Sequence, residues 1–372
     1  MKYRFDEIAI NSTAKKKPGD ADRAHYIGLE HIDSECLTIT RWGSDVTPAG
    51  EKLVMKKGDV LFGKRRAYQR KVGIAPFDGI FSAHGLVLRP NTKIVDSEFF
   101  PFFISSDQFM ERAVRISVGG LSPTINWKDL KEQEFNLPPI AEQKVLAEKL
   151  WAAYRLKESY KKLLTATQEM VKSQFIEMFG ERTTTPVGRY IKDSFPGDWG
   201  KEDLEGNGVK VIRTTNFTNS GKLNLSEVVT RSIEERKVQK KQIHMYDTIL
   251  ERSGGTTENP VGRVVLFEED GLYLCNNFTQ ILRFKDIDPR FAFYALFYFY
   301  QTNKTTIRSM GSKTTGIQNL NMSKYLEIGI PNAAEVEQKH FVSIAEQADK
   351  SGFELRKSIE AIDKVIKSLI NS

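Results

Sequence analysis

The sequence lacks the features that define several common classes of protein. Only two of its 372 residues are cysteine, Cys36 and Cys275, which excludes a disulfide scaffold and a cysteine-rich zinc site. The longest aromatic-rich run, residues 291–300, is about half as long as a membrane span. The opening MKYRFDEIAI has no apolar stretch long enough for a signal peptide. We therefore expect a cytoplasmic protein with no membrane-spanning segment.

Catalytic motifs are also missing. Residues 58–65 (GDVLFGKR) have the spacing of a phosphate-binding loop, but Arg65 stands where the loop needs Ser or Thr. No G-x-G-x-x-G, H-E-x-x-H or G-x-S-x-G occurs. The signature of adenine methyltransferases is absent too, and NLPPI (Asn136–Ile140) is only a near miss. We expect no catalytic residue, no metal site and no cofactor in this chain.

The composition is that of a folded protein with a basic surface. Apolar residues make up 40% and charged residues 28%, which is compatible with a packed core. Lysine and arginine number 55 against 48 acidic residues, a net charge of +7. This excess favours an acidic partner, and nucleic acid is the commonest one. At roughly 150 residues per domain, the length indicates two domains.

The chain repeats itself once. Four segments recur in the same order at a nearly constant offset, which is about half of the chain. The aligned pairs include Asp59 with Asp247 (offset 188), Gly73 with Gly262 (offset 189) and Ile125 with Ile317 (offset 192). Each half opens with short β-type runs, continues with an aromatic helical segment and a Gly/Ser/Thr loop, and ends in a long helix. A repeat of this length indicates a duplicated domain.

The two long helices carry the strongest periodicity, with apolar residues in steps of four and three. No Pro or Gly falls between Ile140 and Phe179, and a helix over this range is about 60 Å long. Each helix could lie on its own domain, but their matched lengths favour pairing with each other. The residues expected to pair are Leu146, Leu150, Leu156, Tyr160, Leu163, Phe341, Leu355, Ile359, Ile362, Ile366 and Leu369.

The predicted fold class is therefore α+β. Two duplicated β-rich domains are joined by two long helices, which pair as an antiparallel coiled coil with pseudo-twofold symmetry. The expected boundaries are 1–137 for the first domain, 138–180 for the central helix, 186–330 for the second domain and 331–372 for the C-terminal helix.

The best candidate for contact with DNA is the segment KRRAYQRK between two β runs. A basic loop of this kind can reach phosphates, and a Gln can read the edge of adenine. The alternative is a solvated surface hairpin. The candidate residues for contact with DNA in this segment are Lys64, Arg65, Arg66, Tyr68, Gln69, Arg70 and Lys71.

The matching loop of the second half, ERSGGTTENP, keeps only Arg252 as a basic residue. A second kind of candidate is the Gly-rich loop of each half, which has Arg115 in the first and Arg308 and Lys313 in the second. Backbone N–H groups of such loops can bind phosphates. A tight turn that places the domain on its long helix would explain the glycine-rich sequence equally well. Asn216 is a further candidate, for which a satisfied turn residue is the commoner explanation.

The repeated order of a β-rich domain, a proline-marked helix start and a long helix resembles the specificity subunits of type I restriction–modification systems. The most specific residues are Pro138, Pro139, Glu142 and Gln143, and then Pro331, Glu337 and Gln338. The second copy departs from the first by two extra residues and by Asn332 in place of the second proline. The resemblance covers nearly the whole chain, but no base-contacting residue carries over by motif.

The resemblance implies that each β-rich domain is a target-recognition domain that reads one half of a bipartite site in double-stranded DNA. The helices would set the spacer between the halves and dock two modification subunits. S-adenosylmethionine would then act in the modification subunit, and ATP with magnesium in a restriction subunit. Two other hypotheses remain: a stand-alone nuclease or methyltransferase with an unrecognised site, and a coiled-coil scaffold.

Overall fold

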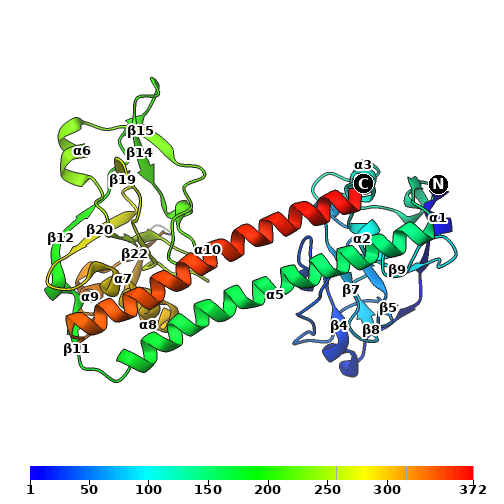
Figure 1. Cartoon of the computed structure of the whole chain (residues 1–372), viewed down its shortest axis with the longest axis horizontal. Coiled ribbons are helices and arrows are strands. Elements are labelled where there is room, and N and C mark those ends of the chain that lie inside the picture. The colour runs from blue at the N-terminus through cyan, green and yellow to red at the C-terminus, as the bar shows by residue number, and fades with distance from the viewer. Residues whose placement is uncertain (257, 315–316, 372) are drawn as a thin grey trace. The chain divides into compact units, whose positions relative to one another are not determined.

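The computed structural model describes residues 1–256, 258–314 and 317–371. The chain divides into two compact units (Figure 1). Unit 1 comprises Met1–Leu163 and Glu354–Ser372, and unit 2 comprises Leu164–Phe353. Helices α5 (Ile140–Phe179) and α10 (Glu335–Asn371) each contribute one segment to either unit. The predicted helix ranges, 138–180 and 331–372, enclose them.

Unit 1 is built on two four-stranded sheets, of order β2-β9-β6-β7 and β3-β5-β8-β4, and a two-stranded sheet, β1-β10. The strands are β1 (Lys2–Arg4), β2 (Ala9–Ser12), β3 (Lys15–Lys16), β4 (Tyr26–Ile27), β5 (Lys52–Met55), β6 (Val60–Phe62), β7 (Val72–Ile74), β8 (Gly79–Phe81), β9 (Leu86–Pro90) and β10 (Glu134–Asn136). The helices are α1 (Phe5–Ile8), α2 (Phe100–Ser105), α3 (Asp107–Arg115) and α4 (Trp127–Leu130), with 3₁₀ turns η1 (Asp20–His25), η2 (Leu29–His31) and η3 (Ala67–Gln69).

Unit 2 has sheets of order β12-β20-β16-β18, β13-β15-β14-β19, β17-β22-β21 and β11-β23. The strands are β11 (Thr184–Pro186), β12 (Ile191–Pro196), β13 (Lys201–Glu202), β14 (Val209–Ile212), β15 (Val229–Ser232), β16 (Thr248–Glu251), β17 (Ser253–Gly254), β18 (Val264–Leu266), β19 (Tyr273–Cys275), β20 (Thr279–Phe284), β21 (Gly311–Thr314), β22 (Ile317–Leu320) and β23 (Gly329–Pro331). The helices are α6 (Glu235–Lys241), α7 (Pro289–Thr302), α8 (Lys304–Ser309) and α9 (Met322–Tyr325), with 3₁₀ turns η4 (Val187–Tyr190) and η5 (Thr214–Asn216).

The duplicated architecture is confirmed by a buried ion pair that recurs in both units. In unit 1, Asp59 accepts two hydrogen bonds from Arg89 of β9, at 2.7 and 2.9 Å. In unit 2, Asp247 accepts two from Arg283 of β20, at 2.9 and 2.7 Å. Both aspartates are buried, where an unpaired charge would be costly. In unit 1 the ion pair joins β9 to the segment before β6, and in unit 2 it joins β20 to the segment before β16.

The structure corrects one aligned pair. Asn126 caps the start of α4 and Asn321 caps the start of α9, an offset of 195. The residue before each cap is buried, Ile125 in unit 1 and Leu320 in unit 2. Ile125 thus corresponds to Leu320 and not to exposed Ile317. The three-residue error arises because the hairpin β21-β22 is longer than the equivalent loop of unit 1.

Aromatic side chains dominate both cores. In unit 1, Phe5 lies against Phe109 and Phe135, with ring centroids 5.3 and 5.7 Å away. Helix α2 lies beside α5 in Figure 1, and the rings of Phe102 and Trp151 meet at 4.9 Å. The run at residues 291–300 forms α7, which is mostly buried in unit 2. Among the described residues, no helix is long and apolar enough to cross a membrane.

The helices pair within each unit. In unit 1, Lys157 of α5 forms a salt bridge with Asp363 of α10. In unit 2, the ring of Phe175 of α5 lies 5.1 Å from that of Phe341 of α10. The partner residue moves backwards along α10 as α5 advances, so the pairing is antiparallel, as predicted.

The residues predicted to pair are all buried or partly buried in α10, whereas two of those predicted in α5 are exposed. In α10, Phe341 and Ile366 are buried, and Leu355, Ile359, Ile362 and Leu369 are partly buried. In α5, Leu150 is buried, and Leu146 and Tyr160 are partly buried. Leu156 and Leu163, however, are 45% and 52% exposed.

The buried face of α5 instead passes through Leu150, Tyr154 and Lys157. Tyr154 turns to unit 1, where its hydroxyl accepts a hydrogen bond from Thr38 N–H at 2.9 Å. The buried face thus departs from the predicted one after Leu150, and the predicted residues Leu156 and Leu163 are exposed.

Candidate nucleic-acid interface

Two segments that the sequence suggested separately lie together in unit 1. We call residues 64–71 the basic loop and residues 115–126 the glycine loop. The basic loop connects β6 to β7, which are paired antiparallel. It contacts the glycine loop through Ile125 N–H, which donates to Lys64 O at 3.0 Å, and Arg66 N–H, which donates to Pro123 O at 2.7 Å. The two loops form one surface.

Two guanidinium groups meet on this surface. Arg65 and Arg66 each donate from Nη2 to Ser122 Oγ, both at 3.1 Å. Among the described residues, neither arginine has a carboxylate within ion-pair distance. Two uncompensated positive charges around one hydroxyl group form a favourable place for a phosphate.

The tip of the basic loop is open to solvent. Tyr68 is 55% exposed, and Gln69 is partly exposed. In the glycine loop, Leu121 is 96% exposed and Arg115 is exposed. Burial lowers the pKa of the Lys64 ammonium group, and the positive charge of Lys15 lowers it further. An aromatic ring, an amide and an apolar side chain thus lie on the same surface as the two arginines.

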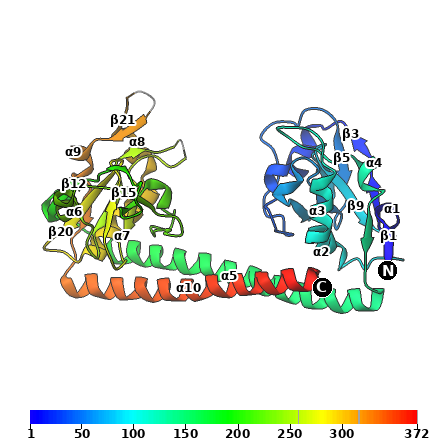
Figure 2. The same ribbon diagram turned by 90° about the horizontal axis from the view of Figure 1, so that it is seen from above.

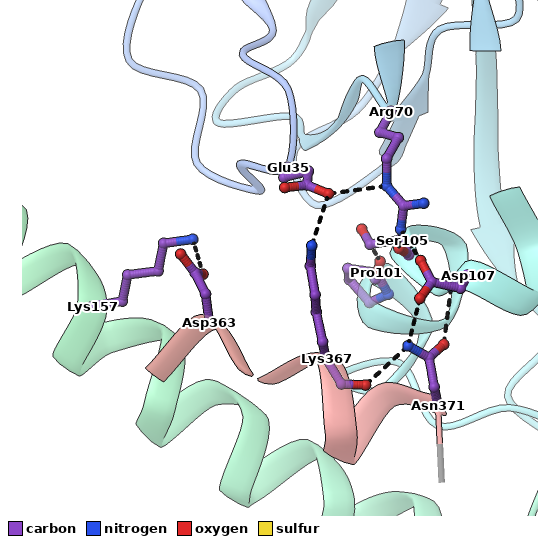
Figure 3. Close-up of polar contacts among 9 residues, drawn as sticks. All are labelled: Glu35, Arg70, Pro101, Ser105, Asp107, Lys157, Asp363, Lys367 and Asn371. Carbon is purple, nitrogen blue, oxygen red and sulfur yellow. Dashed lines mark hydrogen bonds and ion pairs between the residues drawn. The ribbon is translucent and has the colours of Figure 1, made fainter. Parts of the chain in front are cut away.

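Two of the candidates in the basic loop have internal partners. The Lys71 ammonium donates to Leu29 O at 2.6 Å. Arg70 donates to Ser105 O at 2.9 Å and forms an ion pair with Asp107 at 2.7 Å (Figure 3). The cationic groups of these two residues therefore hold the loop onto unit 1, and their contact with DNA stays a prediction.

Unit 2 pairs the equivalent segments through regular strands. Leu320 N–H donates to Arg252 O at 2.8 Å, as Ile125 donates to Lys64 in unit 1. Strand β17 then pairs with β22, where Ser253 Oγ donates to Asn319 Oδ1 at 2.6 Å. Figure 2 shows β21 on the side of unit 2 that faces away from α10. Among the described residues, the Arg252 guanidinium has no ion pair or hydrogen bond.

The remaining candidates of unit 2 differ in their placement. Arg308 is an exposed residue of α8. Lys313 belongs to β21, and its side chain lies outside the described part of the structure. Asn216 is buried and hydrogen-bonded through both side-chain atoms: Arg213 N–H donates to its Oδ1, and its Nδ2 donates to Asn224 O and Glu227 O, all at 2.9 Å. The amide of Asn216 therefore closes a loop, as the alternative of a satisfied turn residue predicts, and base contact by Asn216 stays an untested prediction.

The loop after β16 is also held by a charged pair. Arg263 donates to the two carboxylate oxygens of Glu251 at 2.7 and 3.2 Å, and Glu251 is buried. Burial alone would lower the pKa of Arg263, but the hydrogen bonds and the negative charge of Glu251 together raise it. The positive charge of Arg263 is thus balanced by Glu251 inside the unit. Among the described residues, no group of three His, Cys, Asp or Glu side chains lies close enough to hold a metal ion.

Sequence reasoning missed Ser122 and Leu121. Both lie in the glycine loop, for which a turn and a phosphate site were equally favoured. The relevant signal is the contact between the two loops, and no spacing within either loop contains it.

Comparison with known proteins places this architecture in a family. The family described as the type I restriction modification DNA specificity domain matches residues 8–166 and again 194–363. The chain belongs to this family. The specificity-domain matches cover most of both units and follow the internal duplication.

Two curated relatives and one solved structure illustrate the similarity. The type I restriction enzyme EcoDI specificity subunit of Escherichia coli is 31% identical over 146 residues, which are 38% of this chain and 31% of the relative. The StySPI specificity subunit of Salmonella potsdam is 23% identical over 271 residues, which are 65% of this chain and 55% of the relative. The chain thus spans about a third to about half of the curated relatives that it matches.

The solved structure supports the specificity-domain fold across the whole chain. It is the type I restriction–modification system S subunit from M. genitalium, with a TM-score of 0.57 and 14% identity. The match covers 100% of this chain and 94% of the other.

Proposed function

We propose that this chain is the DNA sequence-specificity subunit of a type I restriction–modification complex, in which each unit reads one half of a bipartite site. The proposal rests on the observation that the two units share a core arrangement and differ in their surface loops. The buried pairs Asp59–Arg89 and Asp247–Arg283 are the same in both units. The loops that follow β6 and β16 differ in sequence, charge and secondary structure, as expected of domains that read different sequences.

Within unit 1, Arg65 and Arg66 supply phosphate contacts, which position the domain without reading sequence. Gln69 and Tyr68 supply base readout, for which the bidentate pairing of Gln with adenine is the physical precedent. Within unit 2, Arg252 and the β17-β22-β21 sheet form the corresponding surface. Arg115 and Arg308, both exposed, add positive charge to the two units.

Two unlike half-sites give a discrimination that neither domain reaches alone. One recognition domain reads only a few base pairs, too few for a useful specificity ratio against a genome. Joining two of them makes the second binding step intramolecular, which multiplies their discrimination.

The chain itself is non-catalytic in this proposal, and it works in the cytoplasm. Methyl transfer from S-adenosylmethionine takes place in two modification subunits, and cleavage driven by ATP with magnesium takes place in restriction subunits. Exposed Leu156 and Leu163 lie seven residues apart on α5, a spacing that places them on one face. This apolar face supports docking of a modification subunit, because a helix of the partner can pack against apolar residues at this spacing.

Methylome sequencing of a host that carries this gene and its neighbours tests the proposal. The expected result is one methylated, asymmetric, bipartite motif. Exchange of residues 186–330 for the equivalent domain of a homologue should change one half of that motif only. Changes in both halves would contradict independent readout. Methylation or cleavage by the purified chain alone would favour a stand-alone enzyme.

A further inference from the structure

The basic loop has a strained backbone. Arg66 and Arg70 flank η3 and have φ angles of 56° and 52°, in the left-handed region. Residues other than glycine adopt this region at an energetic cost and remain there only when their surroundings hold them. The exposed tip, Tyr68 and Gln69, lies between these two points, so its conformation depends on the contacts at both ends.

At Arg66, the contacts are those with the glycine loop that are described above. At Arg70, the contacts involve residues outside both loops. Arg70 Nε lies 3.2 Å from Glu35 Oε1, and Arg70 Nη2 lies 2.7 Å from Asp107 Oδ1 (Figure 3). Its backbone is bound as well, since Glu35 N–H donates to Arg70 O at 3.2 Å.

Both acidic partners of Arg70 also bind the C-terminal turns of α10. Lys367 Nζ lies 3.6 Å from the same Glu35 oxygen that faces Arg70. Asn371 makes two bonds with Asp107: its Oδ1 accepts from Asp107 N–H and its Nδ2 donates to Asp107 Oδ2, both at 3.0 Å. Figure 3 shows Glu35 and Asp107 between Arg70 on one side and α10 on the other.

The α10 segment is firmly seated at this point. Ile366 is buried in the core of unit 1, and Asp363 forms a salt bridge with Lys157 of α5. The cavity left among these side chains measures about 60 Å³ and is lined by Glu35, Arg70 and Lys367 among others. It is too small for a substrate, so the cluster is a packed junction.

We propose that Arg70 is a positioning residue, through which the last turns of α10 hold the basic loop in the conformation that reads DNA. Since the reading of the first half-site belongs to the proposed function, this inference rests on it. Glu35 and Asp107 are the shared elements of the link. Loss of the α10 contacts frees both carboxylates to move, and Arg70 then no longer holds the left-handed turn.

Among the described residues, this link is found in unit 1 and has no counterpart in unit 2. In unit 2, the residue at the offset of 188 from Arg70 is Glu258. In unit 2, the described ion pairs from α10 to other segments end at Arg182, Lys222 and Arg290, none of which lies in the loop after β16. Undocking the last turns of α10 should therefore affect the first half-site and spare the second.

The test compares the full chain with the double variant Lys367→Ala plus Asn371→Ala. The control is Lys364→Ala, which removes the same charge from an exposed residue of α10 that has no ion pair or hydrogen bond among the described residues. The first measurement is hydrogen exchange without DNA. It follows the amides of Arg66, Gln69 and Arg70, which donate to Pro123, Arg66 and Ala67. We expect exchange about tenfold faster in the double variant and unchanged in the control.

The second measurement is selection of bound sequences from a randomised library. Discrimination against single mismatches in the first half-site should fall about five- to tenfold in the double variant, with the second half-site unchanged. Arg70→Ala should have the same effect, and combining it with the double variant should add little, because both break one link.

Unchanged exchange of the three amides would overturn the inference, as would an equal loss at both half-sites with a lower melting temperature. Failure of the unaltered chain, assembled with its modification subunits, to select any sequence would instead contradict the proposed function. The exchange measurement needs no DNA, so it decides the link between α10 and the loop in either case.

Discussion

Gln143 and Gln338 accept the same hydrogen bond in the two halves of the chain. Asp96 N–H donates to Gln143 Oε1 at 2.8 Å, and Asp288 N–H donates to Gln338 Oε1 at 2.9 Å. Both side chains are buried near the start of a long helix. Each also donates from Nε2 to the segment before its helix, Gln143 to Pro138 O at 2.8 Å and Gln338 to Ala333 O at 2.9 Å. The glutamine thus joins the helix start to the loop before the aromatic helices in each unit.

Replacement of this glutamine should destabilise its own unit. Gln143→Met keeps the volume and leaves three partly buried backbone groups without their side-chain partner, which should cost about 1–3 kcal/mol of unfolding free energy. Urea unfolding followed by fluorescence measures it, because three of the four tryptophans, Trp42, Trp127 and Trp151, lie in unit 1.

Two matched variants define the result. Glu142→Ala, an exposed neighbour, should change the stability by less than about 0.5 kcal/mol. Gln338→Met should destabilise unit 2 and leave the tryptophan signal of unit 1 nearly unchanged. Equal stability of Gln143→Met and the unaltered chain would show that the hydrogen bonds contribute nothing.

The sequence could predict what is repeated and could not predict what depends on contacts between segments. The paired glutamines and aspartates were visible as an internal repeat, because both copies keep the same buried polar groups. The apolar spacing of α10 predicted its inward-facing residues, since the six predicted residues from Phe341 to Leu369 are all buried or partly buried. In α5 the buried face contains Lys157, which a search for apolar residues does not include. Lys157 can be buried because it forms a salt bridge with Asp363.

The candidate site shows the same limit. Its location on the basic loop and the glycine loop follows from charge and glycine content. The sequence does not show which cations remain available for contact with DNA. Arg70 and Lys71 are bound by groups that are distant in the sequence, such as Asp107 and Leu29. Asn216 likewise reads as a polar residue beside a strand, and only the fold reveals that its amide is fully used.

Removal of the two free arginines should weaken binding to every DNA sequence. Arg65→Ala plus Arg66→Ala should lower affinity about tenfold per arginine. The slope of log affinity against log salt should flatten by about 0.9 for each lost phosphate contact. Fluorescence anisotropy with a labelled duplex at several salt concentrations measures both.

The control for the arginine variant is Lys93→Ala, an exposed cation outside both loops. It should leave the salt slope nearly unchanged. Gln69→Ala should behave differently, with relaxed selectivity at one position of the first half-site and an unchanged slope. A double arginine variant with the salt slope of the unaltered chain would remove the basic loop from the interface.

The two cysteines should differ in reactivity. Burial raises the pKa of the Cys275 thiol to about 12. Only the thiolate reacts with maleimide, so at pH 8 roughly one Cys275 in ten thousand is reactive. Raising the pH increases this fraction, but it stays small until the pH nears the raised pKa. Cys36 is partly exposed, and we expect one label per native chain at pH 8 and two labels in denaturant, as read by intact mass.

The variant Cys36→Ser identifies the labelled residue. It should take up no label in the native state and one label in denaturant. Rapid native labelling of Cys36→Ser would show that the β19 region opens readily and that Cys275 is not held as described.

The last prediction concerns the spacer between the half-sites. If α5 and α10 set it, one heptad inserted into each helix should lengthen it. Insertion after residue 163 of α5 and after residue 353 of α10 falls at the boundary between the units. Each helix gains about 10.5 Å, at 1.5 Å per residue. This length corresponds to about three base pairs if the helices run parallel to the duplex.

A whole heptad keeps the pairing face in register, whereas three base pairs turn the groove by roughly 100°. Linear spacing and groove phase therefore oppose each other, and DNA twist absorbs part of the mismatch. We expect weaker binding and a preferred spacer longer by about one to three base pairs, measured by selection from a library with randomised gaps. Insertion into α5 alone is the control, because it breaks the pairing and should abolish a defined spacer. If the matched insertion left both spacer and affinity unchanged, the two helices would not set the spacer.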